Sequence, residues 1–175
     1  MKLSSLLILL FFSTQFSFSQ ISFEKTYGDS LDIEEGCCAK QTYDGGYILL
    51  VTNYYDQTGS AFPVLIKTDS LGNQIWSKSW LDFTLYQAYA TSLKITSDSG
   101  FIITGGSWNI GGDIITNDIF LLKTDKDGNQ QWMATYDSIE TNPSVALFDE
   151  YGNDVLPTLD GGYVVTGRTC RYELI

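Results

Sequence analysis

The chain is patterned as short runs of consecutive apolar residues, each of which follows a turn that contains glycine. The clearest runs cover 47–51, 101–103 and 163–165. Because successive side chains of a strand point to opposite faces, apolar residues at consecutive positions predict strands that are covered on both faces. Few stretches have the three-to-four-residue apolar period of an amphipathic helix, while glycine and aromatic residues are abundant and proline is rare. We therefore expect an all-β fold.

A turn motif comes before each of these runs and occurs three times, at similar intervals along the chain. Its copies are Asp44-Gly45-Gly46, Asp98-Ser99-Gly100 and Asp160-Gly161-Gly162. Glycine adopts the positive φ that a hairpin turn demands, and aspartate accepts hydrogen bonds from its own backbone. Each copy predicts a tight turn that leads into a buried strand. A short strand is expected before the turn, at 39–42 and at 92–96.

A second motif recurs in the same order and at nearly the same interval. Segments 65–76 and 121–132 both contain Lys-Thr-Asp, a turn that ends in Gly-Asn, and then a tryptophan. The repeated residues are Asp69, Gly72 and Trp76 in the first copy and Asp125, Gly128 and Trp132 in the second. Each copy predicts two strands joined by a turn, and the tryptophan on the second strand is assigned to blade packing.

Together the two motifs give four strands per unit of about 50 residues, which is the size of a propeller blade. The sequence thus predicts a partial β-propeller of four-stranded antiparallel blades, about two and a half of them. Blade one covers about 36–80, blade two about 87–136, and an incomplete blade three about 150–175. Residues 21–28 match the fourth strand of a blade, so we expect a strand there that could complete the last blade of a ring. Residues 172–175 are expected to begin a third strand, and since a ring needs at least four blades, we expect a truncated sequence.

The repeat resembles that of quinoprotein-type (PQQ-like) β-propellers over nearly all of residues 21–175. The Lys-Thr-Asp-x-x-Gly-Asn-x-x-Trp segments carry this resemblance. The Asp-Gly-Gly-Tyr half is similar to repeats of bacterial proteins exported by the type IX secretion pathway. The turn between Asp69 and Gly72 is one residue shorter than in the enzymatic quinoproteins, and no cofactor pocket is recognisable. The resemblance implies a propeller fold without implying catalysis, and no cofactor is expected.

The first nineteen residues have the pattern of a secretory signal peptide. Lys2 gives a positive start, residues 6–12 form an apolar run, and Ser17 and Ser19 are small residues at the positions that signal peptidase recognises. The run is shorter than the about 20 residues that cross a bilayer, so no transmembrane segment is expected after cleavage. We expect residues 20–175 to be secreted, periplasmic or attached to the cell surface.

Composition restricts the chemistry. The net charge is −11, or −12 without residues 1–19, and clustered Lys and Arg are absent, which argues against nucleic acid as a partner. Without histidine, the usual general base and the commonest zinc ligand are missing, and no catalytic residue is predicted. Neighbouring acids such as Asp149 and Glu150 are interpreted as solvated charges. The odd number of cysteines leaves at least one unpaired, and a bridge from Cys170 to Cys37 or Cys38 stays open.

The turn at 125–129 has closely spaced side-chain oxygens that resemble those of a calcium loop. Its first copy has Leu71 in place of the middle carboxylate, and no glutamate follows at the spacing that bidentate binding requires. The aspartate, glycine and asparagine that the two copies share are those of a hairpin turn, so no metal site is predicted.

Strand order places all tight turns at one end of the blades and the long connections at the other end. Long loops on a rigid scaffold are frequent binding sites. The residues expected to contact a ligand are Tyr54, Tyr55, Tyr86, Trp108 and Asn109. Aromatic rings stack on the apolar face of a sugar or a peptide side chain, and amides fix its orientation. The alternative is that these rings only pack the loops against the rim.

The sequence therefore favours a non-enzymatic exported scaffold that binds an extracellular glycan or protein. One alternative is the N-terminal fragment of a secreted enzyme, such as a quinoprotein-like dehydrogenase or a polysaccharide-degrading protein, with its active residues downstream. The other alternative is a structural repeat that serves adhesion or envelope assembly.

Overall fold

The computed structural model describes residues 22–28, 33–55, 60–80, 87–108, 117–137 and 146–173. The predicted signal peptide and most of the long connections lie outside these ranges. The strands in the described part of the chain are β1 (Ile33–Gln41), β2 (Tyr47–Tyr55), β3 (Ser60–Thr68), β4 (Gln74–Ser79), β5 (Gln87–Ile95), β6 (Phe101–Trp108), β7 (Asn117–Thr124), β8 (Gln130–Tyr136), β9 (Ala146–Pro157) and β10 (Tyr163–Glu173). No helix among the described residues is long and apolar enough to span a membrane.

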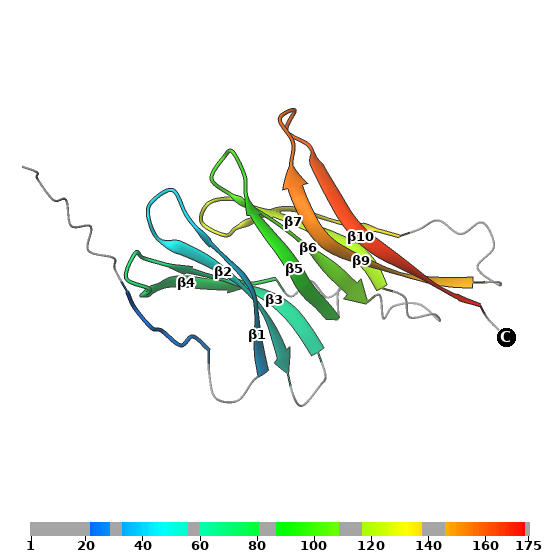
Figure 1. Cartoon of the computed structure of the whole chain (residues 1–175), viewed down its shortest axis with the longest axis horizontal. Helices are drawn as coiled ribbons and strands as arrows, with labels where there is room; N and C mark the ends of the chain where they lie inside the picture. Colours follow the sequence, from blue (N-terminus) through cyan, green and yellow to red (C-terminus); the bar gives the residue numbers. More distant parts are fainter. Residues whose placement is uncertain are drawn as a thin grey trace, which may run out of the picture.

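The strands form two four-stranded sheets and one hairpin, all antiparallel. Sheet one has the order β1-β2-β3-β4 and sheet two the order β5-β6-β7-β8, and β9 pairs with β10. Figure 1 shows sheet one, sheet two and the hairpin one after another across the molecule. The predicted all-β class and the predicted four-stranded antiparallel sheets are confirmed.

Two apolar clusters hold these layers together. The first joins sheet one to sheet two and includes Leu50, Phe101 and Ile103. The second joins sheet two to the hairpin and includes Ile102 and Val155. Phe101 and Ile103 thus belong to one cluster and Ile102 to the other, as the alternation of a strand requires. Consecutive apolar residues on β6 are therefore explained by a sheet that is covered on both faces.

The three predicted aspartate turns all form, and they have the same hydrogen bonds. Asp44, Asp98 and Asp160 accept a hydrogen bond from the backbone nitrogen two residues later, at 3.0, 3.1 and 3.2 Å. The positive φ belongs to the residue directly after the aspartate, at 82° for Gly45 and 85° for Gly161. Ser99 occupies that place in the second turn with a φ of 64°. The glycine of Asp98-Ser99-Gly100 is therefore not the residue that supplies the positive φ.

Replacing Ser99 with glycine is expected to stabilise the protein by about 0.5–1 kcal/mol. A left-handed conformation costs an L-residue about 1–2 kcal/mol, and the extra backbone freedom of glycine in the unfolded chain offsets part of that. Urea unfolding measures the change. Ser97→Gly, in the same turn but without a positive φ, should destabilise, and a loss of stability in both variants would contradict the prediction.

A buried lysine connects the two repeated motifs within each sheet. Lys67 Nζ lies 3.0 Å from an oxygen of Asp44, and Lys123 Nζ lies 2.9 Å from an oxygen of Asp98. Both lysines are buried, and each also donates to the backbone carbonyl of the next residue. The turn aspartate and the lysine of Lys-Thr-Asp thus form one ion pair that joins the two motifs within a sheet. The role of these lysines was not predicted from the sequence.

An aromatic contact repeats between successive layers. Trp76 on β4 packs on Phe101, with ring centroids 6.4 Å apart, and Trp132 on β8 packs on Tyr163 at 5.6 Å. Each tryptophan thus contacts an aromatic ring of the next layer, although Trp132 keeps 37% of its surface exposed. Phe23 makes the same kind of contact with Tyr47, at 5.7 Å.

The N-terminal segment 22–28 lies against sheet one without forming the predicted strand. Lys25 donates to Asn73 at 3.1 Å, as Lys78 on β4 donates to Asn129 at 2.5 Å. The segment thus contacts sheet one as β4 contacts sheet two. The Tyr27 hydroxyl also donates to the carbonyl of Gly72. Among the described residues the segment has no backbone pairing with sheet one, so it is not a strand of that sheet.

The first strand of each unit contains a bulge that was not predicted from the sequence. The register shifts at Cys37 on β1, at Thr91 on β5 and at Asn153 on β9. A bulge adds one unpaired residue and increases the local twist of a strand. These first strands are also longer than predicted, since β1 and β5 begin at Ile33 and Gln87.

The hairpin differs from the predicted third blade. Tyr172 and Glu173 do not begin a third strand, because they continue β10 and pair with Leu147 and Ala146. Strand β9 begins at Ala146, before the predicted boundary near 150, and this early start supplies backbone partners for the whole of β10.

Candidate functional site

The long-connection end of the sheets holds those predicted ligand-contacting residues that the structure describes. Tyr54 and Tyr55 are the last residues of β2, and Trp108 is the last residue of β6. The side chains of Tyr54 and Trp108 are partly exposed. Tyr86, Asn109 and the side chain of Tyr55 lie outside the described residues.

An aromatic group at this end spans three strands from two layers. The ring of Tyr89 on β5 lies 5.3 Å from that of Trp108 and 6.0 Å from that of Tyr151 on β9. Arg168 on β10 stacks over Tyr151 at 4.3 Å. Gly106 makes room for the ring of Tyr89, since a Cβ at that position would lie 2.6 Å from the tyrosine oxygen. Burial raises the pKa of Tyr89, so its hydroxyl stays protonated.

Hydrogen bonds fix the polar groups beside these rings. The backbone nitrogen of Asn117, the first residue of β7, donates to Asp149 at 3.0 Å, and its side-chain nitrogen donates to the Tyr151 hydroxyl at 3.1 Å. On sheet one, the Tyr54 hydroxyl donates to Glu35 at 3.3 Å. Aromatic rings beside fixed amide and carboxylate groups are the composition of a surface that binds polar ligands with apolar faces.

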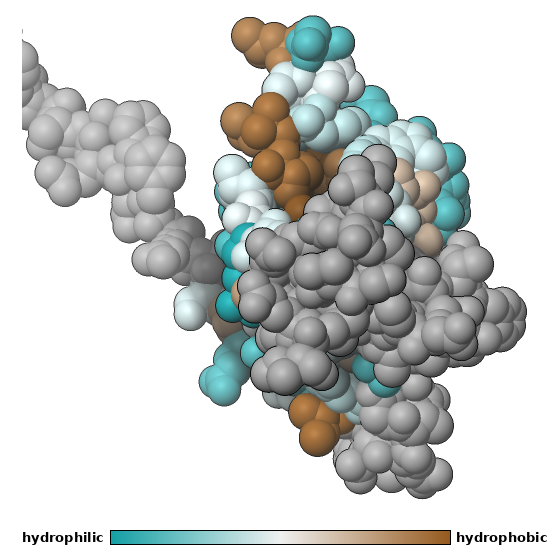
Figure 2. Space-filling view, turned by 90° about the vertical axis from the view of Figure 1, so that its right-hand side faces the viewer, coloured by the Kyte–Doolittle hydropathy of each residue, from teal (hydrophilic) through white to brown (hydrophobic). Residues whose placement is uncertain are grey.

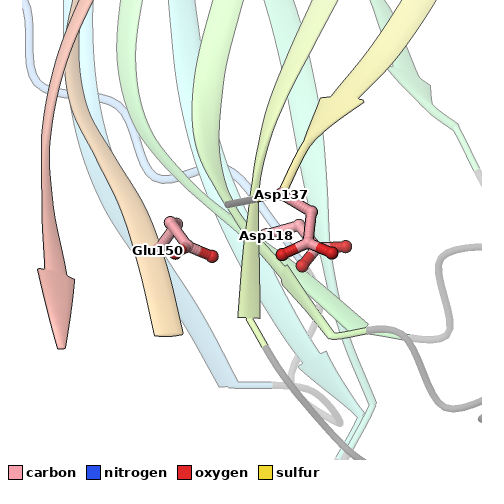
Figure 3. Close-up of side chains that lie close together, drawn as sticks. All are labelled: Asp118, Asp137 and Glu150. Carbon is pink, nitrogen blue, oxygen red and sulfur yellow. The ribbon is translucent and has the colours of Figure 1, made fainter. Parts of the chain in front are cut away.

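A group of three carboxylates lies at the same end. Asp118 on β7, Asp137 directly after β8 and Glu150 on β9 have carboxylate oxygens within 4.8 Å of one another. Figure 3 shows Asp118 beside Asp137, with the Glu150 carboxylate directed toward them. Asp118 and Glu150 are only 8% and 5% exposed, so the interpretation of Glu150 as a solvated charge is wrong.

Burial raises the pKa of Asp118 to about 6, and the nearby charges of Asp137, Glu150 and Asp149 act in the same direction. Its Oδ1 atom is buried and accepts no hydrogen bond. This group was missed because its members are distant from one another in the sequence and belong to no shared motif. The β7–β8 register supplies the missing information, since Ile119 pairs with Tyr136 and thereby places Asp118 opposite Asp137.

The cysteines lie at a different place. Cys37, Cys38 and Cys170 are free thiols, and no bridge joins them. Cys37 and Cys38 line a cavity of about 430 Å³ on sheet one, together with Tyr27 of the N-terminal segment. A hydrogen bond from the Cys37 thiol lowers the pKa of Cys38 to about 7, although burial of Cys38 opposes this shift.

Comparison of the chain with protein-family models and with curated proteins found no match. The class of this protein is therefore defined by its architecture. It is an all-β protein built from repeated antiparallel four-stranded sheets that stack on one another. One end of the stack has short aspartate turns, and the other has aromatic and acidic side chains.

Proposed function

We propose that this chain is the N-terminal part of an exported β-propeller of the PQQ-like repeat kind, and that it binds an extracellular glycan through its long-connection end. The repeated contacts between layers support the propeller. The same aromatic pair occurs between the N-terminal segment and sheet one, between sheets one and two, and between sheet two and the hairpin. In a β-propeller the blades repeat around an axis, so each blade is expected to make the same contacts with the next one.

The outer side of the hairpin also supports a further layer. Val164 on β10 is 51% exposed, whereas Ile48 and Ile102, which follow the same turn in the other two units, are fully buried. Leu156 and Leu159 of the hairpin are exposed as well. Figure 2, which looks onto this side, shows apolar surface along its upper part. Monomeric soluble proteins rarely leave such groups of apolar side chains uncovered.

One observation carries the proposed binding. The ring of Tyr89 contacts both the ring of Trp108 and the ring of Tyr151, and Tyr151 lies beside Asn117 and Asp149. A sugar has apolar C–H faces that stack on such rings and hydroxyls that bond to such amides and carboxylates. The predicted contact residues Tyr54 and Trp108 belong to this end, which lies away from the tight turns.

A glycan array with the purified protein tests the proposal. We expect binding to a defined subset of glycans and a loss of about fivefold or more in affinity for Trp108→Ala, because a stacking ring contributes about 1 kcal/mol or more. Tyr43→Ala is the matched control, since Tyr43 is 78% exposed in a turn at the opposite end. If no glycan on the array binds and the protein instead captures a protein from envelope extracts, the ligand is a protein and the glycan proposal is wrong. If neither a glycan nor an envelope protein binds, the proposed binding function is ruled out.

A further inference from the structure

The carboxylate group formed by Asp118, Asp137 and Glu150 is not required by the repeat. When the two copies of the second motif are aligned on their tryptophans, Asp118 and Asp137 correspond to Phe62 and Leu81. Neither of those residues is acidic. Asp118 and Asp137 are therefore particular to the junction where β7 and β8 meet β9, and the fold of a unit does not explain these two acids.

Without a bound cation this group would be unfavourable. Asp118 is only 8% exposed, its Oδ1 accepts no hydrogen bond, and the β7–β8 register places it opposite another aspartate. Like charges opposite each other on neighbouring strands are destabilising, and a buried carboxylate without a partner is more so. Within the described ranges, ion pairs of lysines are made with Asp44, Asp154, Asp98 and Asp127, and none includes Asp118 or Asp137.

We propose that Asp118, Asp137 and Glu150 bind a Ca²⁺ ion between sheet two and the hairpin. All three side chains offer oxygen, the ligand atom that Ca²⁺ prefers. Two ligands on opposite sides of a calcium ion are about 4.6–5.2 Å apart, since each lies about 2.3–2.6 Å from it, whereas around Mg²⁺ the span is only about 4.2 Å. The oxygens here lie within 4.8 Å of one another, so one calcium ion can reach all three carboxylates.

The position of the site gives the ion a structural role and an entry path. Asp137 is exposed, so that the ion can enter from solvent and water can complete its coordination. Glu150 belongs to the hairpin and Asp118 to sheet two, and the ion would therefore join the two layers. This inference does not depend on glycan binding.

The test is thermal unfolding and titration calorimetry of the purified protein after treatment with EDTA. We expect Ca²⁺ to raise the melting temperature, with a Kd of about 0.1–1 mM as in other extracellular calcium modules, and Mg²⁺ to bind more weakly. Asp118→Asn should weaken Ca²⁺ binding by at least about tenfold, the usual effect of losing even an outer partner of a metal. In EDTA the same variant should melt higher than the wild type, because it neutralises the buried carboxylate.

The matched control is Asp127→Asn, which removes one exposed carboxylate at the opposite end and should leave both effects unchanged. If Asp118→Asn fails to fold, Asp137→Asn tests the same ion through an exposed ligand. The proposal is overturned if the wild type shows no shift and no heat up to about 10 mM Ca²⁺, above the weakest range of protein calcium sites. Equal affinity for Mg²⁺, or an equal loss in Asp127→Asn, overturns it too.

Discussion

Replacing Phe101 with alanine is expected to destabilise the protein by about 3–5 kcal/mol, the usual cost of removing a buried phenylalanine ring. Phe101 is 1% exposed, begins β6, and belongs to the cluster between the two sheets. Its ring contacts Trp76 of sheet one, so the substitution opens a cavity at the junction of the layers. Urea unfolding followed by tryptophan fluorescence and by circular dichroism measures the loss.

A double-mutant cycle with Trp76→Ala separates this contact from simple burial. We expect a coupling energy of about 0.5–1.5 kcal/mol between the two rings. Ile75→Ala is the control on the same strand, because Ile75 is 59% exposed and should change stability by no more than about 0.5 kcal/mol. Additive effects of Trp76→Ala and Phe101→Ala would show that the sheets do not pack through these rings.

The second large effect is expected for Asp98→Asn, which removes the charge opposite a buried lysine. Lys123 is 4% exposed and would keep only the carbonyl of Thr124 as a strong acceptor. Breaking a fully buried pair costs about 3–5 kcal/mol, but the Asp98 side chain is 51% exposed, and solvent screening reduces the expected loss at pH 7 to about 1–3 kcal/mol. Urea unfolding at pH 7 measures it.

The same pair gives a pH dependence with a definite sign. Hydrogen bonds from Thr96 and Lys123 lower the pKa of Asp98 to about 2 from an ordinary value of 3.8, although burial opposes this, and the pKa of Asp44 is lowered to about 2 in the same way. Between these values the unfolded chain binds more protons than the folded protein. The stabilisation is therefore complete above about pH 4 and is lost as the pH falls through about 2.

Asp98→Asn should therefore reduce the slope of stability against pH between about pH 4 and 2. Asp127→Asn is the control, since its partner Lys126 is exposed and no change at pH 7 is expected. An unchanged acid slope in Asp98→Asn would show that the Asp98–Lys123 pair contributes nothing to folding.

Those parts of the fold that depend on local chemistry could be predicted from the sequence. The turns at Asp44, Asp98 and Asp160 and the strands after them are determined by residues that are neighbours in the chain. The Asp98–Lys123 pair joins two different motifs, and only the pairing of β6 with β7 brings them together. The sequence predicted that a new strand begins at Tyr172, whereas β10 continues to Glu173. This prediction was wrong for a similar reason, because the length of β10 depends on where its partner β9 begins.

The sequence places its candidate ligand-contacting residues at the end of the sheets where the aromatic and acidic groups lie, but it does not indicate all of the side chains that gather there. Tyr54 and Trp108 follow strands that the sequence indicates clearly. Tyr89 was missed because β5 was expected to begin at 92, and the small residues on either side of Tyr89 give no apolar run. Asp118 and Asp137 meet only through the β7–β8 register. Residue types alone do not determine a register.

The lysine pair and the aromatic pair differ in what they connect. Asp44 and Lys67 belong to the same unit, whereas Trp76 and Phe101 belong to neighbouring units. A gene that gains or loses one whole unit would therefore keep the aspartate–lysine turn pair in each four-stranded sheet that remains, whereas the Lys94–Asp154 pair, which joins sheet two to the hairpin, depends on both neighbours. If sheet two were deleted, Trp76 would meet Tyr163, which is again an aromatic ring after an aspartate turn. Unequal recombination between repeats would thus change the length of the chain while the buried Lys67 or Lys123 of a retained sheet keeps its own turn aspartate.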